Sequence, residues 1–234
     1  MRRVAIHQPN FLPWMGYLAK IAKSDYFIFL DNVHFSKGSF TNRSKILDGG
    51  HPKWLTIPAK PPLGTQISEV QITSVEWKKK HLAKIEQNYR NSEFSADILT
   101  MLRDLYFEEN TSQLSTFNIR LIKAISKLLD LNVTFLCSSD ISDNSFDSPT
   151  HRLVTLIKEI GGATYISGSG GQNYQDLCLF TEQSINVEYT NYVERPYKQN
   201  SPSFHPGLSC IDTLCNIGIN ATRQSLLKWI GNQQ

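Results

Sequence analysis

The feature that most constrains this chain is a pair of prolines placed just after its first apolar run. Residues Val4–Ile6 have the composition of a buried strand, and this run ends at the polar pair His7 and Gln8. Pro9 and Pro13 then exclude both a continued β-ladder and an early helix, because proline lacks the N–H group that either structure needs. The chain therefore has to leave the strand through an irregular turn.

A helix and a second strand are predicted beyond that turn. From Trp14 the apolar residues recur at helical spacing, through Leu18 and Ile21 to about Lys23. Residues 26–30 form a second apolar run, which ends in Asp31. The sequence thus predicts a βαβ unit with polar groups at the carboxyl end of each strand, where open α/β sheets bind ligands.

Strand and helix patterns alternate along the rest of the chain. Further strands are predicted at residues 54–58, 67–72, 133–137, 164–166 and 185–189. Helices are predicted in a long block over 76–131, from Ser148 to Gly161, near 174–180 and in two pieces over 208–229. The alternation favours an α/β fold with a doubly wound, mostly parallel, Rossmann-like sheet. We expect one compact unit, made of a first α/β half (1–75), an inserted helical subdomain (76–131) and a second half with C-terminal helices (132–234).

The composition argues against several classes of protein. A hydrophobic content of 40% supports a sizeable core, so global disorder is not expected. A formal net charge of +3, with no basic run longer than residues 78–80, argues against nucleic-acid binding. No apolar run approaches the roughly 20 residues of a membrane span, and the N-terminus lacks a signal core, so we expect a cytoplasmic protein. Four cysteines without CxxC spacing predict reduced, buried thiols at Cys137, Cys178, Cys210 and Cys215.

Two segments have the composition of anion-binding loops. Residues 32–47 follow a predicted strand and are rich in donors, including Lys37, Asn42, Arg43 and Lys45, which suits binding of a phosphate or a sugar. The alternative for this segment is an ordinary exposed loop. The glycine-rich turn Ser167–Gly171 also follows a strand, and backbone N–H groups approach an anion closely where side chains are absent. A tight strand-to-helix turn would need glycine as well.

Three side chains form a candidate catalytic group. If the first two predicted strands are neighbours, His7, Asp31 and His34 come toward one crevice. A histidine oriented by a carboxylate is a competent general base near neutral pH. The alternatives are that Asp31 caps a turn and His7 is semi-buried. A metal site formed by the same residues is a further alternative, but the spacing fits no strong zinc pattern, so no metal ligands are assigned.

Several short motifs resemble one protein family. They begin with His7-Gln8-Pro9-Asn10-Phe11-Leu12-Pro13-Trp14 and continue at Phe35–Lys37, Asn42–Arg43, Trp54–Pro58, Ile166–Gly168, Tyr197 and Leu208–Ser209. In these residues the chain resembles the WbqC-like family, whose bacterial members are often encoded among O-antigen and other lipopolysaccharide genes. The turn at Leu12–Tyr17 also loosely resembles the opening of HIGH-type nucleotidylyltransferases, but it holds Pro13 and Tyr17 where that motif has histidines.

The resemblance implies a transferase of surface-polysaccharide biosynthesis. We expect it to move an acyl or aminoacyl group, from coenzyme A or a carrier-protein thioester, to the amine of a nucleotide sugar. The alternatives are an ATP-dependent nucleotidyl-transfer enzyme and a non-catalytic binding protein of a polysaccharide assembly complex. A homo-oligomer is compatible with the sequence.

The roles follow from this hypothesis. His7 would be the general base, Asp31 would orient it, and His34 would position the sugar. The expected substrate-binding residues are Gln8, Asn10, Trp14, Tyr17, Lys37, Asn42, Arg43, Lys45, Arg152, Ser167, Gly168, Ser169, Gly170, Tyr174 and Tyr197.

Overall fold

The centre of the molecule is a five-stranded parallel sheet. The structure, a computed structural model, describes residues 2–108, 111–142 and 146–231. The strands are β1 (Arg3–His7), β2 (Tyr26–Phe29), β5 (Thr134–Cys137), β6 (Thr164–Gly168) and β7 (Asn186–Thr190). Their spatial order is β5-β2-β1-β6-β7, and every neighbouring pair is parallel. The predicted mostly parallel sheet is confirmed.

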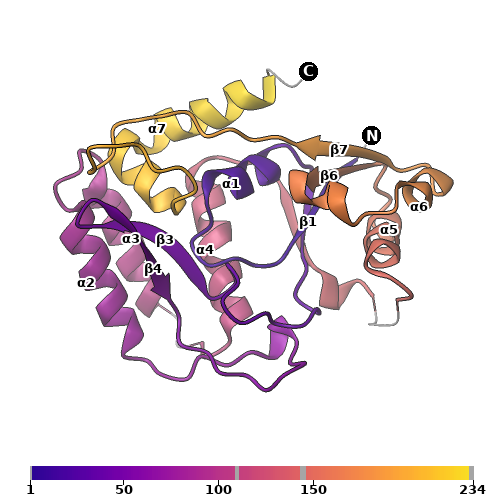
Figure 1. The fold of residues 1–234 in the computed structure, drawn as a ribbon, viewed down its shortest axis with the longest axis horizontal. Coiled ribbons are helices and arrows are strands. Elements are labelled where there is room, and N and C mark those ends of the chain that lie inside the picture. Colours follow the sequence, from indigo (N-terminus) through magenta and orange to yellow (C-terminus); the bar gives the residue numbers. More distant parts are fainter. Residues whose placement is uncertain (1, 109–110, 143–145, 232–234) are drawn as a thin grey trace.

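Helices cover both faces of this sheet. On one face, α5 (Pro149–Glu159) and α6 (Leu177–Glu182) pack on side chains that β1 and β6 direct toward them, including Val4, Ile6 and Tyr165. On the other face, α1 (Met15–Ala22) packs beside the C-terminal helix α7 (Cys210–Gly231) and joins the larger core. The arrangement is visible in Figure 1, with β1, β6 and β7 on the right. The sheet is doubly wound, as the alternation predicted.

The direction of winding reverses between β1 and β6. The chain adds β2 and then β5 on one side of β1, and β6 and then β7 on the other side. Open α/β sheets bind ligands at such a switch point, in the crevice outside the carboxyl ends of the strands. Here those ends are His7 of β1 and Gly168 of β6.

A separate antiparallel hairpin lies beside the sheet. It consists of β3 (Arg43–Asp48) and β4 (His51–Thr56), joined at Gly49 and Gly50, whose φ angles are +61° and +79°. Two successive positive φ angles make the tight turn that matches strand twist, and glycine adopts them without strain. The prediction of a loop over 32–47 is therefore wrong for its last five residues. Residues 43–46 alternate between the outer face and the core, which is strand behaviour, with Ser44 and Ile46 buried; Leu47 is buried as well.

The strand predicted at residues 67–72 is wrong. Ile67–Glu69 form a single 3₁₀ turn, η1, closed by a capping box between Gln66 and Glu69. The side chain of Glu69 accepts the backbone N–H of Gln66 at 3.1 Å, so the segment satisfies its own polar groups locally. Gln71 and Ile72 then make isolated bridges only.

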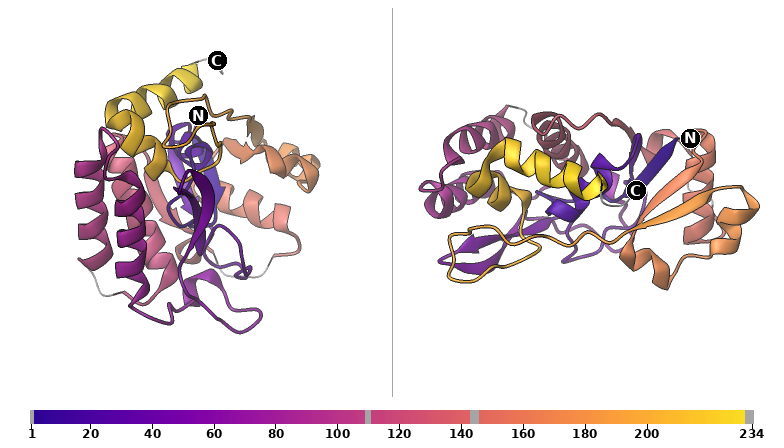
Figure 2. Two further views of the ribbon diagram at one scale, coloured as in Figure 1. Left: turned by 60° about the vertical axis from the view of Figure 1, so that its left-hand side comes forward. Right: turned by 90° about the horizontal axis from the view of Figure 1, so that it is seen from above.

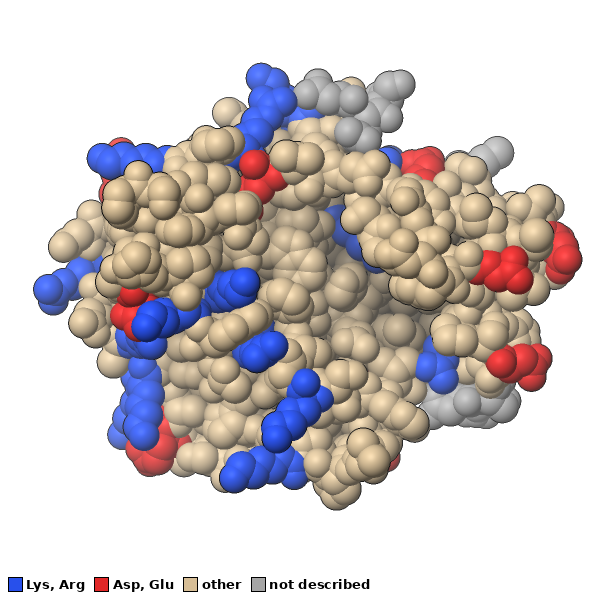
Figure 3. Space-filling model, viewed as in Figure 1, with Lys and Arg blue, Asp and Glu red and all other residues tan. Residues whose placement is uncertain are grey.

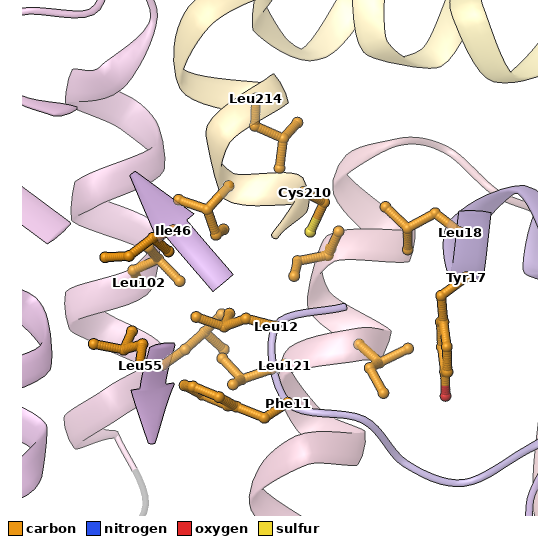
Figure 4. Close-up of a cluster of buried hydrophobic side chains, with 14 of the residues drawn as sticks. Phe11, Leu12, Tyr17, Leu18, Ile46, Leu55, Leu102, Leu121, Cys210 and Leu214 are labelled. Carbon is orange, nitrogen blue, oxygen red and sulfur yellow. The ribbon is translucent and has the colours of Figure 1, made fainter. Parts of the chain in front are cut away.

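Three helices fill the block predicted to be helical. They are α2 (Trp77–Tyr89), α3 (Ser95–Phe107) and α4 (Leu114–Leu128), seen from two further directions in Figure 2. Their apolar faces meet the hairpin, α1 and α7 in one continuous core. Figure 4 shows Phe11 and Leu12 pointing into it, among Leu55, Leu102 and Leu121. The boundaries 1–75, 76–131 and 132–234 stay a prediction.

The two expected C-terminal helical pieces are present, and they meet at a sharp kink inside the element α7. Helix α7 runs from Cys210 to Gly231, but Gly218 in its middle has the non-helical angles φ +79° and ψ 171°. A Cβ atom there would lie 2.8 Å from the ring of Phe94, so glycine serves both the bend and the close approach.

The prediction of four reduced, buried thiols is only partly correct. All four cysteines are free, and Cys210 and Cys215 are buried as predicted, but Cys178 is exposed and Cys137 is half-buried. Cys178 lies in the first turn of the short helix α6, most of whose residues face outward.

Within the described residues, no helix is long and apolar enough to cross a bilayer.

Candidate functional site

A two-lobed crevice lies at the switch point between β1 and β6. Its first lobe, about 350 Å³, is bounded by α1 and by Thr190–Val193, at the end of β7. Its second lobe, about 420 Å³, is bounded by the turn after β6, by Leu153 of α5 and by Tyr174. Five residues line both lobes: His7, Trp14, Lys20, Gly168 and Ser169. The lobes therefore meet where the strand order reverses, and Figure 3 shows this face of the molecule hollowed.

His7 is held in the neutral form by its surroundings. Its Nδ1 lies 3.2 Å from the carbonyl oxygen of Gln8, and its ring meets the edges of Tyr17 and Trp14 at centroid distances of 4.8 and 6.0 Å. Burial, and then the positive charge of Lys20, lower the pKa of His7 to about 3. The imidazole has a free lone pair at neutral pH but holds a transferred proton weakly.

Lys20 is a buried lysine at the junction of the two lobes. Its Nζ donates a hydrogen bond of 2.7 Å to the carbonyl oxygen of Ile6 and lies 5.8 Å from the centroid of the Tyr165 ring. The residue is 5% exposed, and burial lowers the pKa of its amine to about 7. Sequence reasoning missed Lys20 as a site residue. The available signal was a single charge in the otherwise apolar helix Met15–Ala22.

The turn between β1 and α1 is mostly a structural element. Asn118 of α4 donates hydrogen bonds to the carbonyl oxygens of Pro9 (2.8 Å) and Thr41 (2.7 Å), and Ser44 donates to that of Leu12 (2.7 Å). Leu12 has φ +37°, an unusual conformation for a branched residue, and its side chain is fully buried. Asn10, predicted to bind substrate, is also buried. The turn thus anchors His7, Gln8 and Trp14 rather than contacting a ligand along its whole length.

Aromatic residues form the α1 wall of the crevice. Trp14 and Tyr17 line the first lobe, and the Tyr17 hydroxyl donates to the carbonyl oxygen of Gln8 at 2.9 Å. A Cβ atom on Gly16 would lie 2.8 Å from Nε1 of Trp14, so the glycine lets the indole lie over the first turn of the helix. Both predicted aromatic residues are therefore at the crevice.

The glycine-rich turn after β6 forms the floor of the second lobe. Gly168 and Gly170 have open space where a Cβ atom would stand, and both line the lobe together with Ser167, Ser169 and Gly171. Ser167 is buried, and its hydroxyl exchanges hydrogen bonds with the Gln175 side chain at 3.0 and 3.2 Å. The Ser167 hydroxyl is therefore engaged by Gln175, whereas the backbone of the two glycines is left open.

Asp31 and His34 have hydrogen-bond partners other than His7. The Asp31 carboxylate accepts hydrogen bonds from the Ser139 N–H and hydroxyl and from the Ser138 hydroxyl, at 2.8–3.0 Å, at the end of β5. His34 is exposed and makes a backbone bridge to Gln66. Among the described hydrogen bonds and ion pairs, none joins His7 to either residue. Leu30, just before Asp31, lines the second lobe and donates its N–H to the carbonyl oxygen of His7 at 2.9 Å, but neither Asp31 nor His34 is among the residues that line the two lobes.

The basic residues of the predicted loop form an outward face of the hairpin. The Arg43 guanidinium and the Lys45 amine lie 4.0 and 5.0 Å from the centroid of the Trp54 ring. Trp54 contacts Phe40, and Phe40 contacts Trp14 of the crevice, with ring centroids 5.6 and 5.0 Å apart. We call Trp14, Phe40 and Trp54 the aromatic path, because it links the crevice to the hairpin. Figure 3 shows Lys and Arg side chains gathered over the hairpin region.

The remaining predicted residues have different surroundings. Lys37 is exposed, while Asn42 is buried and donates to the carbonyl oxygen of Ile57 at 3.1 Å. Arg152 lines a neighbouring cavity of about 410 Å³, which shares Gln8 and Tyr174 with the second lobe. Tyr197 lies elsewhere, because its hydroxyl donates to the buried carboxylate of Asp212 at 2.7 Å.

Sequence reasoning also missed the segment at the end of β7. Thr190, Asn191, Tyr192 and Val193 line the first lobe, and Tyr165 of β6 lines the second. These positions follow or belong to the second half of the sheet, whose place beside β1 is set by long-range pairing. Among the described residues, no three His, Cys, Asp or Glu side chains converge on a point where a metal ion could be held.

Comparisons with known proteins identify a family. The model of the WbqC-like protein family matches residues 8–224. The chain is 34% identical over 224 residues to an uncharacterized protein of Mycobacterium tuberculosis, Rv1507c, covering 94% of this chain and 96% of that protein. No solved structure matches the chain. With a family model that spans nearly the whole sequence, this chain belongs to the WbqC-like protein family.

Proposed function

We propose that this protein transfers an acyl or aminoacyl group to the amine of a nucleotide-linked amino sugar in surface-polysaccharide biosynthesis. The observation that carries the proposal is the two-lobed crevice, whose lobes share His7, Trp14 and Lys20. A transfer between two substrates needs two binding spaces with one common wall, at which the donor carbonyl and the acceptor amine meet. Membership of the WbqC-like family supports the pathway.

Each lobe suits one of the two substrates. The second lobe offers open glycine backbone at Gly168 and Gly170, which suits the diphosphate of a nucleotide sugar, and Arg152 lies in the adjoining cavity. The first lobe has the aromatic wall of Trp14, Tyr17 and Tyr192, which suits an acyl chain or a pantetheine arm. The cations on Trp54, at the far end of the aromatic path, would meet the phosphates of a coenzyme A donor.

The test measures transfer and binding separately. Purified protein is mixed with a panel of nucleotide amino sugars and acyl-thioester donors, and products are sought by mass spectrometry. We expect a product heavier than the sugar by the acyl group, and calorimetric binding of the nucleotide sugar. Arg152→Met should weaken binding of the nucleotide sugar, while Lys158→Met, an exposed cation on the same helix, should not. No product together with no binding would refute the proposal.

A second candidate function is nucleotide activation with ATP. Counting the strands β1, β2, β5, β6 and β7 from first to fifth, their spatial order is 3-2-1-4-5, which begins the dinucleotide-binding order. A thermal shift with ATP and magnesium, but not with nucleotide sugars, would favour this function over acyl transfer, because specific ligands stabilise by mass action.

A further inference from the structure

Lys20 differs from the other lysine on its segment in having no acidic partner. Its Nζ contacts the Ile6 carbonyl oxygen and the face of Tyr165, and among the described ion pairs none includes it. Lys23, three residues later, lies 2.9 Å from the carboxylate of Glu188 on β7. Both lysines are buried, so the pairing and not the exposure separates them. A buried ammonium without a carboxylate is disfavoured relative to the free amine.

The titratable groups around Lys20 do not restore its charge. His7 of β1 lines both lobes with it and is neutral, since burial is the largest cause that lowers the pKa of His7. Tyr165 of β6 is a phenol whose pKa is raised by burial, and Glu188 of β7 is occupied by Lys23. Tyr17, on the same helix, donates its hydroxyl to Gln8. The pKa of Lys20, about 7, follows from burial alone, so much of the amine is unprotonated at neutral pH.

Acyl transfer to an amino sugar needs a side chain that can accept a proton at neutral pH. An amino sugar arrives as an ammonium, which has no lone pair to attack a thioester. One proton must leave before the new bond can form, and the acceptor must lie where the two substrates meet. His7 and Lys20 both line the two lobes, but burial lowers the pKa of His7 to about 3, so the amine of Lys20 is the better proton acceptor of the two.

We propose that the Lys20 amine is the general base of the site, an inference that rests on the proposed acyl transfer. Its Nζ takes one proton from the sugar ammonium, and the freed amine attacks the thioester carbonyl carbon. The C–N bond forms, the C–S bond breaks, and the thiolate takes the second proton from nitrogen to leave as a thiol. Lys20 then releases its proton to solvent, so no oxidant or reductant is required.

The protonation of Lys20 is measured first, without any substrate. Protein labelled with ¹³Cε-lysine is titrated by NMR, and the Lys20 signal is assigned from its loss in Lys20→Arg. We expect a midpoint near pH 7 for Lys20. A midpoint near the ordinary lysine value of about 10.4 would be enough to refute Lys20 as the general base.

Catalysis is measured second, with the acyl-transfer assay. Lys20→Met and Lys20→Arg should each lower kcat by about 10²–10⁴ while KM changes little, because arginine keeps the charge but cannot accept a proton. Lys23→Met is the matched control on the same helix end and should keep most of kcat. Full activity of Lys20→Arg would show that only the positive charge matters and would refute a base.

The two proposals fail in different ways. If the wild-type protein neither binds the nucleotide sugar nor gives product while Lys20 titrates near pH 7, acyl transfer is refuted, and so is the role of Lys20 as its base. If product forms but the pH profile of kcat is unchanged by Lys20→Arg, the transfer stands and the base is another group.

Discussion

Removing the side-chain amide of Asn118 should destabilise the turn that carries the crevice residues. Asn118 lies on α4, is fully buried and donates to the carbonyl oxygens of both Pro9 and Thr41. Proline gives the turn no N–H of its own at positions 9 and 13, so part of its hydrogen bonding has to come from outside. Asn118→Leu keeps a similar volume and removes both donors, leaving two buried carbonyl oxygens without these partners.

The expected loss of stability follows from those two bonds. A buried acceptor left without its partner costs about 1–3 kcal/mol, so two should cost about 2–6 kcal/mol. For a chain of this size, 1 kcal/mol corresponds to about 2–4 °C in Tm, which predicts a fall of at least about 4 °C. Because the same turn positions His7, Gln8 and Trp14, ligand affinity should fall as well.

Urea unfolding of the two variants, followed by circular dichroism, measures the effect. Thr116→Ala, an exposed position two residues earlier on α4, is the control and should change the free energy of unfolding by less than about 0.5 kcal/mol. If Asn118→Leu unfolds within about 0.5 kcal/mol of the wild type, the turn does not depend on this donor and the argument fails.

Three further predictions test other parts of the structure. Burial lowers the pKa of His81 to about 4, so on acidification from about pH 6.5 the unfolded chain binds a proton before the folded chain does. The free energy of unfolding should therefore fall by about 2 kcal/mol between pH 7 and pH 5. His81→Gln should remove this part of the pH dependence, measured by urea unfolding across that range. Gly218→Ala places a Cβ atom 2.8 Å from the Phe94 ring at φ +79° and should cost about 1–3 kcal/mol in thermal unfolding, whereas Gly231→Ala, which has open space, should be nearly neutral. Trp54→Leu removes the ring beneath Arg43 and Lys45 and should cost about 1–2 kcal/mol, measured against Lys53→Met on the same strand; an unchanged Tm would contradict a stabilising role for the two cation–ring contacts.

The sequence predicts the α/β fold well because the main strands are short apolar runs bounded by polar residues. Val4–Ile6 and residues 26–30 can be assigned from composition alone, and the structure places β1 and β2 there. The hairpin strand Arg43–Asp48 was missed although its alternation was present, since its outward positions are charged. Polar outer faces resemble loops when only composition is weighed.

The candidate site was only partly predictable, for a topological reason. The strand ends were identified, but the neighbour that completes the crevice at His7 is β6, more than 150 residues away along the chain. Local patterns carry no information on which strand pairs with which. Lys20 was overlooked for a related reason, because one lysine in a helix is ordinary until burial and the lack of a carboxylate are known.

The aromatic path gives the molecule a built-in optical reporter. Of the four tryptophans, Trp14 lines both lobes, and its ring is in contact with the imidazole of His7 and the phenyl ring of Phe40. Any molecule that enters either lobe changes the polarity around this indole, while Trp77 stays within the helical core. Emission from the unmodified chain can therefore follow the filling of the crevice in real time, with Trp14→Phe as the reference for the signal of the other three tryptophans.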